Sequence, residues 1–181
     1  MTTGTTRTPE VALPVAALGA VMEALNAQLG PEAAADALRT AGYAAGDAFF
    51  RILAGSSPDE LKTLPADRFW GRLGMLFSAR GWGHFRYEQA HPGVGSLESA
   101  DWVESRTDSV AEQPACHFTT GLLANLLGNV AGAEVGVIEV ECRSRGDGRC
   151  RFLFGGTDAV YAVYHRMAEG ESSDAALEGI G

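Results

Sequence analysis

The hydrophobic pattern of the first 80 residues is helical. Apolar residues recur at spacings of three to five between positions 13 and 29, and Gly30-Pro31 ends that helix and begins the next. The second helix is expected over 31–54, with Gly42 and Gly46 letting another backbone approach closely. A third helix is indicated by five apolar side chains that fall on one face of a 3.6-residue period: Phe69, Trp70, Leu73, Leu76 and Phe77.

After Gly81 the pattern changes to one typical of strands. Residues 82–89 carry aromatic side chains and few helix signals, and residues 94–105 alternate between apolar and polar positions. His91-Pro92-Gly93 separates the two segments as a turn, so we expect an antiparallel hairpin. Another helix is predicted from Pro114, with small residues such as Gly121 on its apolar face that permit tight packing on a sheet.

A second hairpin and a last helix follow. Residues 134–142 are rich in Val and Ile, Gly146-Asp147-Gly148 is a turn, and residues 149–154 form the returning strand. The final helix begins near Thr157. Two hairpins and several helices pack best as one antiparallel sheet with helices against it, so the predicted fold class is α+β with N-terminal helices.

Composition narrows the class of protein. The chain has 181 residues with 46% hydrophobic side chains, which fits one soluble domain, expected over residues 10–168. Residues 1–9 are expected to form a flexible leader, and residues 169–181 a flexible tail. A net charge of −9 argues against direct nucleic-acid binding. There is no signal peptide and the longest apolar runs are about half of what a membrane span needs, so we expect a cytoplasmic protein.

The three cysteines form the best candidate site. Cys142 and Cys150 flank the turn of the second hairpin, and Cys116 immediately precedes the apolar helix, whose N-terminus favours a thiolate. Three thiolates and one further ligand complete a tetrahedral zinc site. Burial of three reduced thiols, or a Cys142–Cys150 disulfide, are the alternatives.

Spacing alone does not select the fourth metal ligand. Glu139, Glu141 and His117 are the candidates. In a regular strand, neither Glu139 nor Glu141 would share a face with Cys142. Joint binding would therefore need a bulge, a strong twist or the end of the strand.

A set of motifs between residues 116 and 154 resembles the 4-vinyl reductase domain family. It comprises Cys116-His117-Phe118, Gly121, Glu139-Val140-Glu141-Cys142, Gly146-Asp147 and Cys150-Arg151-Phe152. The family is named for a protein of bacteriochlorophyll synthesis and includes the sensory domains of phenol- and xylene-responsive transcription activators. The order of elements before the motif also fits, so the resemblance extends from about residue 10 to 168.

The resemblance has implications for fold, metal and ligand. It implies a fold shared with vesicle-tethering (Golgi-transport) and nitric-oxide-signalling domains, a homodimer, and an internal hydrophobic pocket. It also implies a zinc ion held by Cys116, Glu139, Cys142 and Cys150. Because four protein ligands leave no position for water, such a zinc would be structural. The chain lacks the ATPase and helix-turn-helix motifs of the activators, so a sensor of this kind must report through another chain.

The leading functional hypothesis is a stand-alone sensor-like domain that holds a small hydrophobic or aromatic molecule. Aromatic residues are concentrated between positions 69 and 102, and all three tryptophans lie there. The candidate pocket residues are Phe69, Trp70, Phe77, Trp82, Phe85 and Trp102.

Two other functions are kept as alternatives. An accessory protein or reductase of tetrapyrrole metabolism is suggested by the family name, although no GxGxxG, GxSxG or HExxH motif supports catalysis. A protein-interaction scaffold is the second. Four arginines on one hairpin of an acidic protein could bind an acidic partner: Arg143, Arg145, Arg149 and Arg151.

Overall fold

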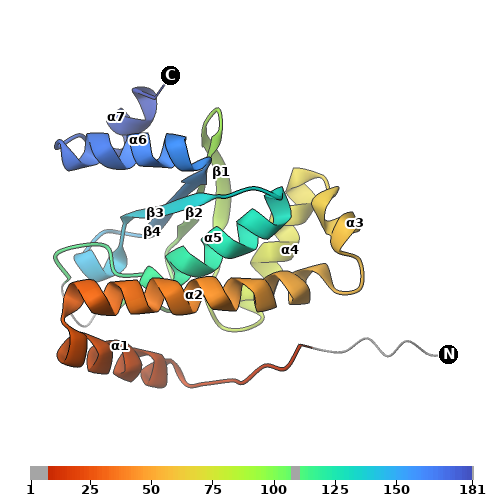
Figure 1. Cartoon of the computed structure of the whole chain (residues 1–181), viewed down its shortest axis with the longest axis horizontal. Helices are drawn as coiled ribbons and strands as arrows, with labels where there is room; N and C mark the ends of the chain where they lie inside the picture. Colours follow the sequence, from red (N-terminus) through yellow and green to blue (C-terminus); the bar gives the residue numbers. More distant parts are fainter. Residues whose placement is uncertain (1–7, 107–110, 181) are drawn as a thin grey trace.

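The structure is a computed structural model that describes residues 8–106 and 111–180. Within them, helices cover both faces of one antiparallel sheet (Figure 1), which confirms the predicted α+β class. The helices are α1 (Val15–Leu29), α2 (Pro31–Ala54), α3 (Pro58–Lys62), α4 (Ala66–Ser78), α5 (His117–Ala131), α6 (Thr157–Ala168) and α7 (Ser173–Glu178), and a 3₁₀ turn, η1, spans Arg143–Arg145. The strands are β1 (Arg86–His91), β2 (Val94–Ser99), β3 (Gly136–Glu141) and β4 (Cys150–Gly155). No helix in these described ranges is both long and apolar enough to span a membrane.

The two predicted hairpins join edge to edge into a single sheet. The strand order is β1-β2-β4-β3, and every neighbouring pair is antiparallel. The central strands β2 and β4 connect the hairpins, with Leu97 opposite Phe152 and Ser99 opposite Cys150. This pairing places the start of β4 at the end of the sheet where the cysteines gather.

The second arm of the first hairpin is shorter than the alternation predicts. Strand β2 ends at Ser99, and Trp102 lies in the turn that follows. The Trp102 ring is nonetheless buried in the core, and the Val103 N–H donates to the Trp82 carbonyl at 2.9 Å. A compact turn thus reproduces the apolar spacing of a strand.

The sheet has a hydrophobic core on each face. Helices α2, α4 and α5 cover one face, and α6 and α7 cover the other (Figure 1). The smaller core, beneath α6 and α7, is built on Val94 and Leu153 of the central strands together with Val163 of α6. The sheet is therefore the middle layer of three.

The C-terminal segment is not the flexible tail that the sequence predicts. Residues 173–178 form α7, and the side chains of Leu177 and Ile180 are buried in the smaller core. Asp174 accepts a hydrogen bond from Arg151 of β4 at 2.7 Å, which fixes α7 to the sheet. Two apolar residues three apart were too weak a signal to predict this helix. In the leader, residues 1–7 lie outside the described residues, and Glu10 forms an ion pair with Arg80.

Helices α2 and α5 pack backbone to backbone through glycines. A Cβ atom on Gly42 would meet the carbonyl oxygen of Phe118 at 1.9 Å, and one on Gly121 would meet that of Arg39 at 2.0 Å. The close approach expected at Gly42 is confirmed, whereas Gly121 packs on a helix and not on the sheet. Tight packing on α2 fixes the position of α5, which carries Cys116 at its N-cap.

We predict that Gly42→Ala destabilises the fold by about 2 kcal/mol or more, because its methyl group would overlap the α5 backbone. Gly71→Ala is the matched control, since it lies in α4 with open space around its Cα. It should stabilise by about 0.5–1 kcal/mol through helix propensity. Urea denaturation measures both values, and equal effects of the two substitutions would contradict the packing described here.

Candidate metal centre

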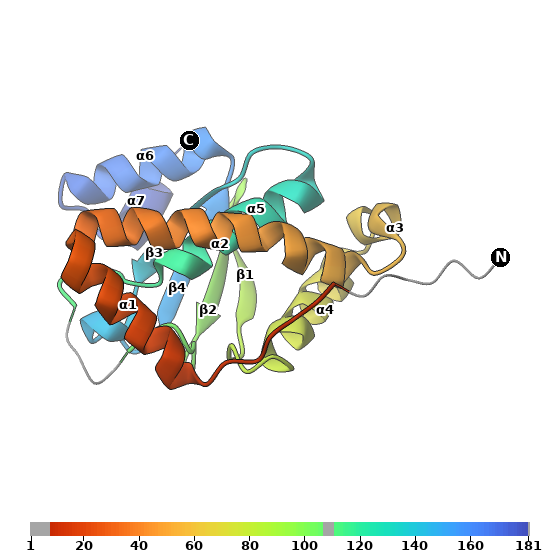
Figure 2. The same ribbon diagram turned by 60° about the horizontal axis from the view of Figure 1, so that its bottom comes forward.

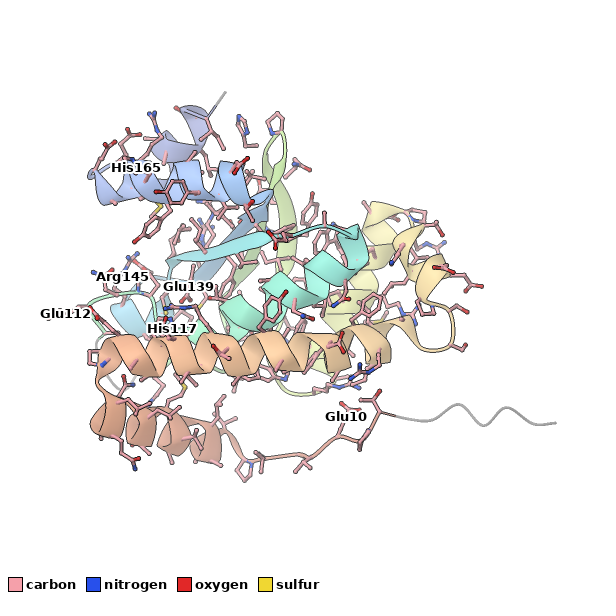
Figure 3. The ribbon with its side chains drawn as sticks, viewed as in Figure 1. Glu10, Glu112, His117, Glu139, Arg145 and His165 are labelled. Atoms are coloured by element: carbon pink, nitrogen blue, oxygen red, sulfur yellow. The ribbon has the colours of Figure 1, made fainter. Side chains whose placement is uncertain are left out.

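Three thiols and one carboxylate converge beside the N-terminus of α5. The ligand atoms of Cys116, Glu139, Cys142 and Cys150 all lie within 4.8 Å of one another. The three cysteines are buried, and Figure 3 shows Glu139 close to His117, the first residue of α5. The donors come from a helix N-cap and from both arms of the second hairpin, as the sequence predicts.

The turn of the hairpin is held by an aspartate. One Asp147 carboxylate oxygen accepts from the Cys142 N–H at 2.7 Å and from the Arg145 Nε–H at 2.9 Å. Gly146 has φ +97°, a left-handed conformation that favours glycine. These contacts fold the chain back so that Cys142 and Cys150 face the same point.

A β-bulge solves the parity problem of Glu139 and Cys142. Glu139 lies opposite Phe152 and Glu141 opposite Arg151, so Val140 is an extra residue in β3. The bulge reverses the alternation, and Cys142 follows directly after the strand ends. Both a bulge and a strand end, which the sequence analysis named as routes to joint ligation, are present.

The sulfur separations fit a metal and not a disulfide. The Cys116 sulfur lies 3.9 Å from the sulfurs of Cys142 and Cys150. A disulfide needs about 2.05 Å, and all three cysteines are free. Zinc–sulfur bonds of about 2.3 Å in a tetrahedron place two sulfurs about 3.8 Å apart. The thiols are therefore already spaced for zinc.

The carboxylate of Glu139 has one satisfied oxygen and one without a partner. Oε2 accepts from the Cys116 N–H at 2.8 Å, whereas Oε1 is buried with no hydrogen-bond partner among the described residues. A buried oxygen of this kind is costly unless something binds it. A cation among the three sulfurs would supply the missing interaction.

The structure separates Glu139 from the other two candidates for the fourth ligand. Glu141 accepts two hydrogen bonds from Arg149, both at 2.9 Å. The Nδ1 atom of His117 lies 3.4 Å from the Arg39 guanidinium. Neither belongs to the group of four donors.

Burial shifts the protonation of the donors. It raises the pKa of the Cys116 thiol well above its usual value and the pKa of the Glu139 carboxyl to about 9. Hydrogen bonds from the other two thiols lower the pKa of Cys142. Several anions cannot share such a site without a cation. Soft thiolates with one carboxylate in a tetrahedral spacing suit zinc, and four protein donors would close its coordination.

A buried glutamate beside the centre was missed by the sequence analysis. The Glu104 carboxylate accepts from the N–H groups of Phe118 and Thr119 at 2.8 Å each and from the Thr119 hydroxyl at 2.5 Å. Burial raises its pKa to about 7. It caps α5 from 13 residues upstream of the first residue of that helix, a distance at which no local capping pattern exists.

The six aromatic residues predicted for a pocket divide into two groups. Phe77, Trp82, Phe85 and Trp102 pack against one another, with the Phe77 and Trp102 ring centroids 5.3 Å apart. These four rings form part of the core. Phe69 and Trp70 instead line a pocket of about 500 Å³.

The pocket lies among α3, α4, the C-terminal end of α5 and the end of β4. Its wall is mainly apolar and is formed by Leu61, Lys62, Leu64, Ala66, Phe69, Trp70, Leu127, Val130, Ala131, Ala133, Glu134, Val135, Phe154, Gly155 and Gly156. Residues such as Leu127 and Phe154 were missed because helix and strand periodicity does not distinguish a pocket wall from the core.

The four arginines of the second hairpin are bound within the protein. Arg149 pairs with Glu98 and Glu141, and Arg151 with Asp174. Arg145 binds Asp147, and Arg143 donates to the Ser105 hydroxyl at 3.3 Å. These contacts satisfy the charges that the scaffold hypothesis assigned to an acidic partner.

Fold and site together define an α+β domain with a buried centre of three cysteines and one glutamate. Residues 104–155 match the family model of the 4-vinyl reductase domain, which confirms the resemblance to that family. No curated protein matches the sequence.

Two solved structures are similar to the chain. The phenol-responsive sensory domain of the transcription activator PoxR, in a crystal structure with phenol, aligns with a TM-score of 0.72 at 19% identity, over 90% of this chain and 84% of that one. A vinyl-4-reductase family protein from Methanocaldococcus jannaschii aligns with a TM-score of 0.49 at 17% identity, over 80% of this chain and 82% of that one. The first match supports the fold assignment.

We predict about one zinc ion per purified chain by elemental analysis. Glu139→Gln should lower the zinc content and Cys142→Ser should abolish it, because each removes a donor. Loss of the ion should lower Tm by about 6–12 °C, the equivalent of roughly 3 kcal/mol. Glu141→Gln is the control and should retain zinc. A metal-free wild type whose Tm is unchanged by chelation would falsify the site.

Proposed function

We propose that the chain is a sensor-like domain that binds a small hydrophobic or aromatic molecule and is held together by a structural zinc ion. The observation that carries the proposal is the apolar pocket bounded by Phe69, Trp70, Leu127 and Phe154. The fold supports it, because the similar PoxR domain responds to phenol. The cytoplasmic location expected from the sequence stays a prediction.

The size and chemistry of the pocket suit such a ligand. Pockets for small molecules are typically about 300–1,000 Å³ and mostly apolar, and this one measures about 500 Å³. A cavity of about 150 Å³ already holds benzene in another protein. The pocket therefore has room for an aromatic ring with substituents. The Trp70 ring, stacked on Tyr87 at 4.2 Å, gives it a rigid aromatic wall.

The zinc ion would support this pocket without taking part in binding. Helix α5 carries Cys116 at its N-cap and Leu127 and Val130 near its other end. A closed metal site at the first end fixes the helix against the second hairpin, which supplies Phe154 to the pocket wall. The proposal thus assigns the metal a structural role.

Tryptophan fluorescence should report ligand binding through Trp70. We predict a saturable change on titration with the correct member of a panel of phenols, fatty acids and tetrapyrroles. Trp70→Phe should remove most of that change, whereas Trp82→Phe should retain it, because the Trp82 ring packs in the core and is not among the residues of the pocket wall. The absence of a response to every class would contradict the proposal, and a response to tetrapyrroles alone would favour the tetrapyrrole alternative.

We further propose that the chain forms a homodimer through α1. Figure 2 shows α1 on the outer side of α2, away from the sheet. Its outward residues are apolar, with Leu13 just before the helix 72% exposed and Val21 54% exposed. The only charged residue of α1, Glu23, is already paired with Arg106. An uncharged apolar face of this kind is complementary to the same face of a second copy.

Light scattering after size-exclusion chromatography tests the dimer. The double variant Leu13→Glu and Val21→Glu should be monomeric, because it places two carboxylates in the apolar contact. Met75→Glu, at an exposed position of α4, is the control and should remain dimeric. A monomeric wild type, or a double variant that stays dimeric, would count against α1 as the interface.

A further inference from the structure

Two opposite charges lie at the rim of the apolar pocket. Lys62 and Glu134 are the charged residues of its wall, and both side chains are exposed. Across the described ranges, neither makes a hydrogen bond or ion pair with another described residue, in contrast to the arginines and acids of the sheet. Lys62 is also the only lysine of the chain. The two charges are therefore available to a bound molecule.

A second, polar pocket adjoins the first at these residues. It measures about 540 Å³ and shares Lys62, Ala133, Glu134 and Val135 with the apolar pocket. Its other side lies between α2 and α5, where it is lined by Tyr43, Asp47, Asn125 and Asn129 among others. A molecule at the shared border would have an apolar wall on one side and a polar wall on the other.

The polar wall offers both a donor and an acceptor. The Asn129 amide donates to the Asn125 side-chain oxygen at 2.9 Å. That bond leaves the Asn125 amide group as a donor and the Asn129 oxygen as an acceptor. Asp47 is already engaged by Arg51 at 2.5 Å. The groups available at the border thus comprise one cation, one anion, one neutral donor and one neutral acceptor.

We infer that the ligand is a zwitterion with an apolar body, of the class of hydrophobic amino acids. This inference rests on the proposed function. The apolar body would lie against Trp70 and Phe154, its carboxylate would accept from Lys62, and its ammonium would donate to Glu134. An acid without an amine would face the Glu134 charge with no compensation, an amine without an acid would face Lys62, and a neutral molecule would use neither charge.

Four probes with the same phenyl ring separate these cases. They are phenylalanine, 3-phenylpropanoate, 2-phenylethylamine and ethylbenzene, which carry both charges, the carboxylate alone, the ammonium alone and neither. Titration of the full chain, followed by Trp70 fluorescence, should give a Kd for phenylalanine at least about tenfold lower than for each of the other three, the equivalent of one lost charge contact.

Two variants assign the charges to their partners. Lys62→Met should weaken phenylalanine and 3-phenylpropanoate about tenfold and leave 2-phenylethylamine unweakened. Glu134→Gln should weaken phenylalanine and 2-phenylethylamine by a similar factor and leave 3-phenylpropanoate unweakened. Both residues are exposed, so the variants should fold, and an unchanged Tm verifies this.

The outcomes distinguish the inference from the proposed function. Equal affinities for the four probes, or variants that alter none of them, would overturn the zwitterion inference and leave the apolar pocket intact. Binding of phenol or a fatty acid with no binding of phenylalanine would do the same. If no probe, phenol, fatty acid or tetrapyrrole binds, the proposed function fails and the inference fails with it.

Discussion

The rest of the structure depends on a buried cluster of donors that requires a cation. Three sulfurs and a carboxylate oxygen lie within 4.8 Å of one another, and Glu139 Oε1 is buried without a partner among the described residues. Burial disfavours every additional anion in such a space, and a dication reverses that penalty. The same four side chains connect the start of α5 to both arms of the β3–β4 hairpin. One ion would therefore link the helical layer to the sheet.

Helix α5 carries this constraint across the molecule. Its N-terminus is fixed by Cys116 and capped by the buried Glu104 carboxylate, and its middle lies against the α2 backbone through Gly121. Its C-terminal turns form one wall of the apolar pocket. A helix held at one end and along its length presents its other end in a defined position. Separate metal and ligand sites on one rigid element are consistent with a metal that shapes the pocket without entering it.

The sequence predicted features that depend on local patterns. Helical periodicity and the Gly30-Pro31 boundary located α1 and α2, and the turn at Gly146 placed Cys142 beside Cys150. Features formed by distant residues were not predictable in the same way. The bulge at Val140 selects Glu139 over Glu141, and Glu104 caps a helix that begins 13 residues away. The burial of Leu177 depends on packing between α6 and the sheet, which local hydrophobicity does not reveal.

The central claim is that a zinc ion joins Cys116, Glu139, Cys142 and Cys150. X-ray absorption at the zinc edge on the purified full chain tests it most directly, because the first coordination shell reports both the donor types and their distances. The account predicts three sulfurs at about 2.3 Å and one oxygen at about 2.0–2.2 Å, with no bound water. A shell of nitrogen and oxygen alone, or protein purified without zinc, would contradict it.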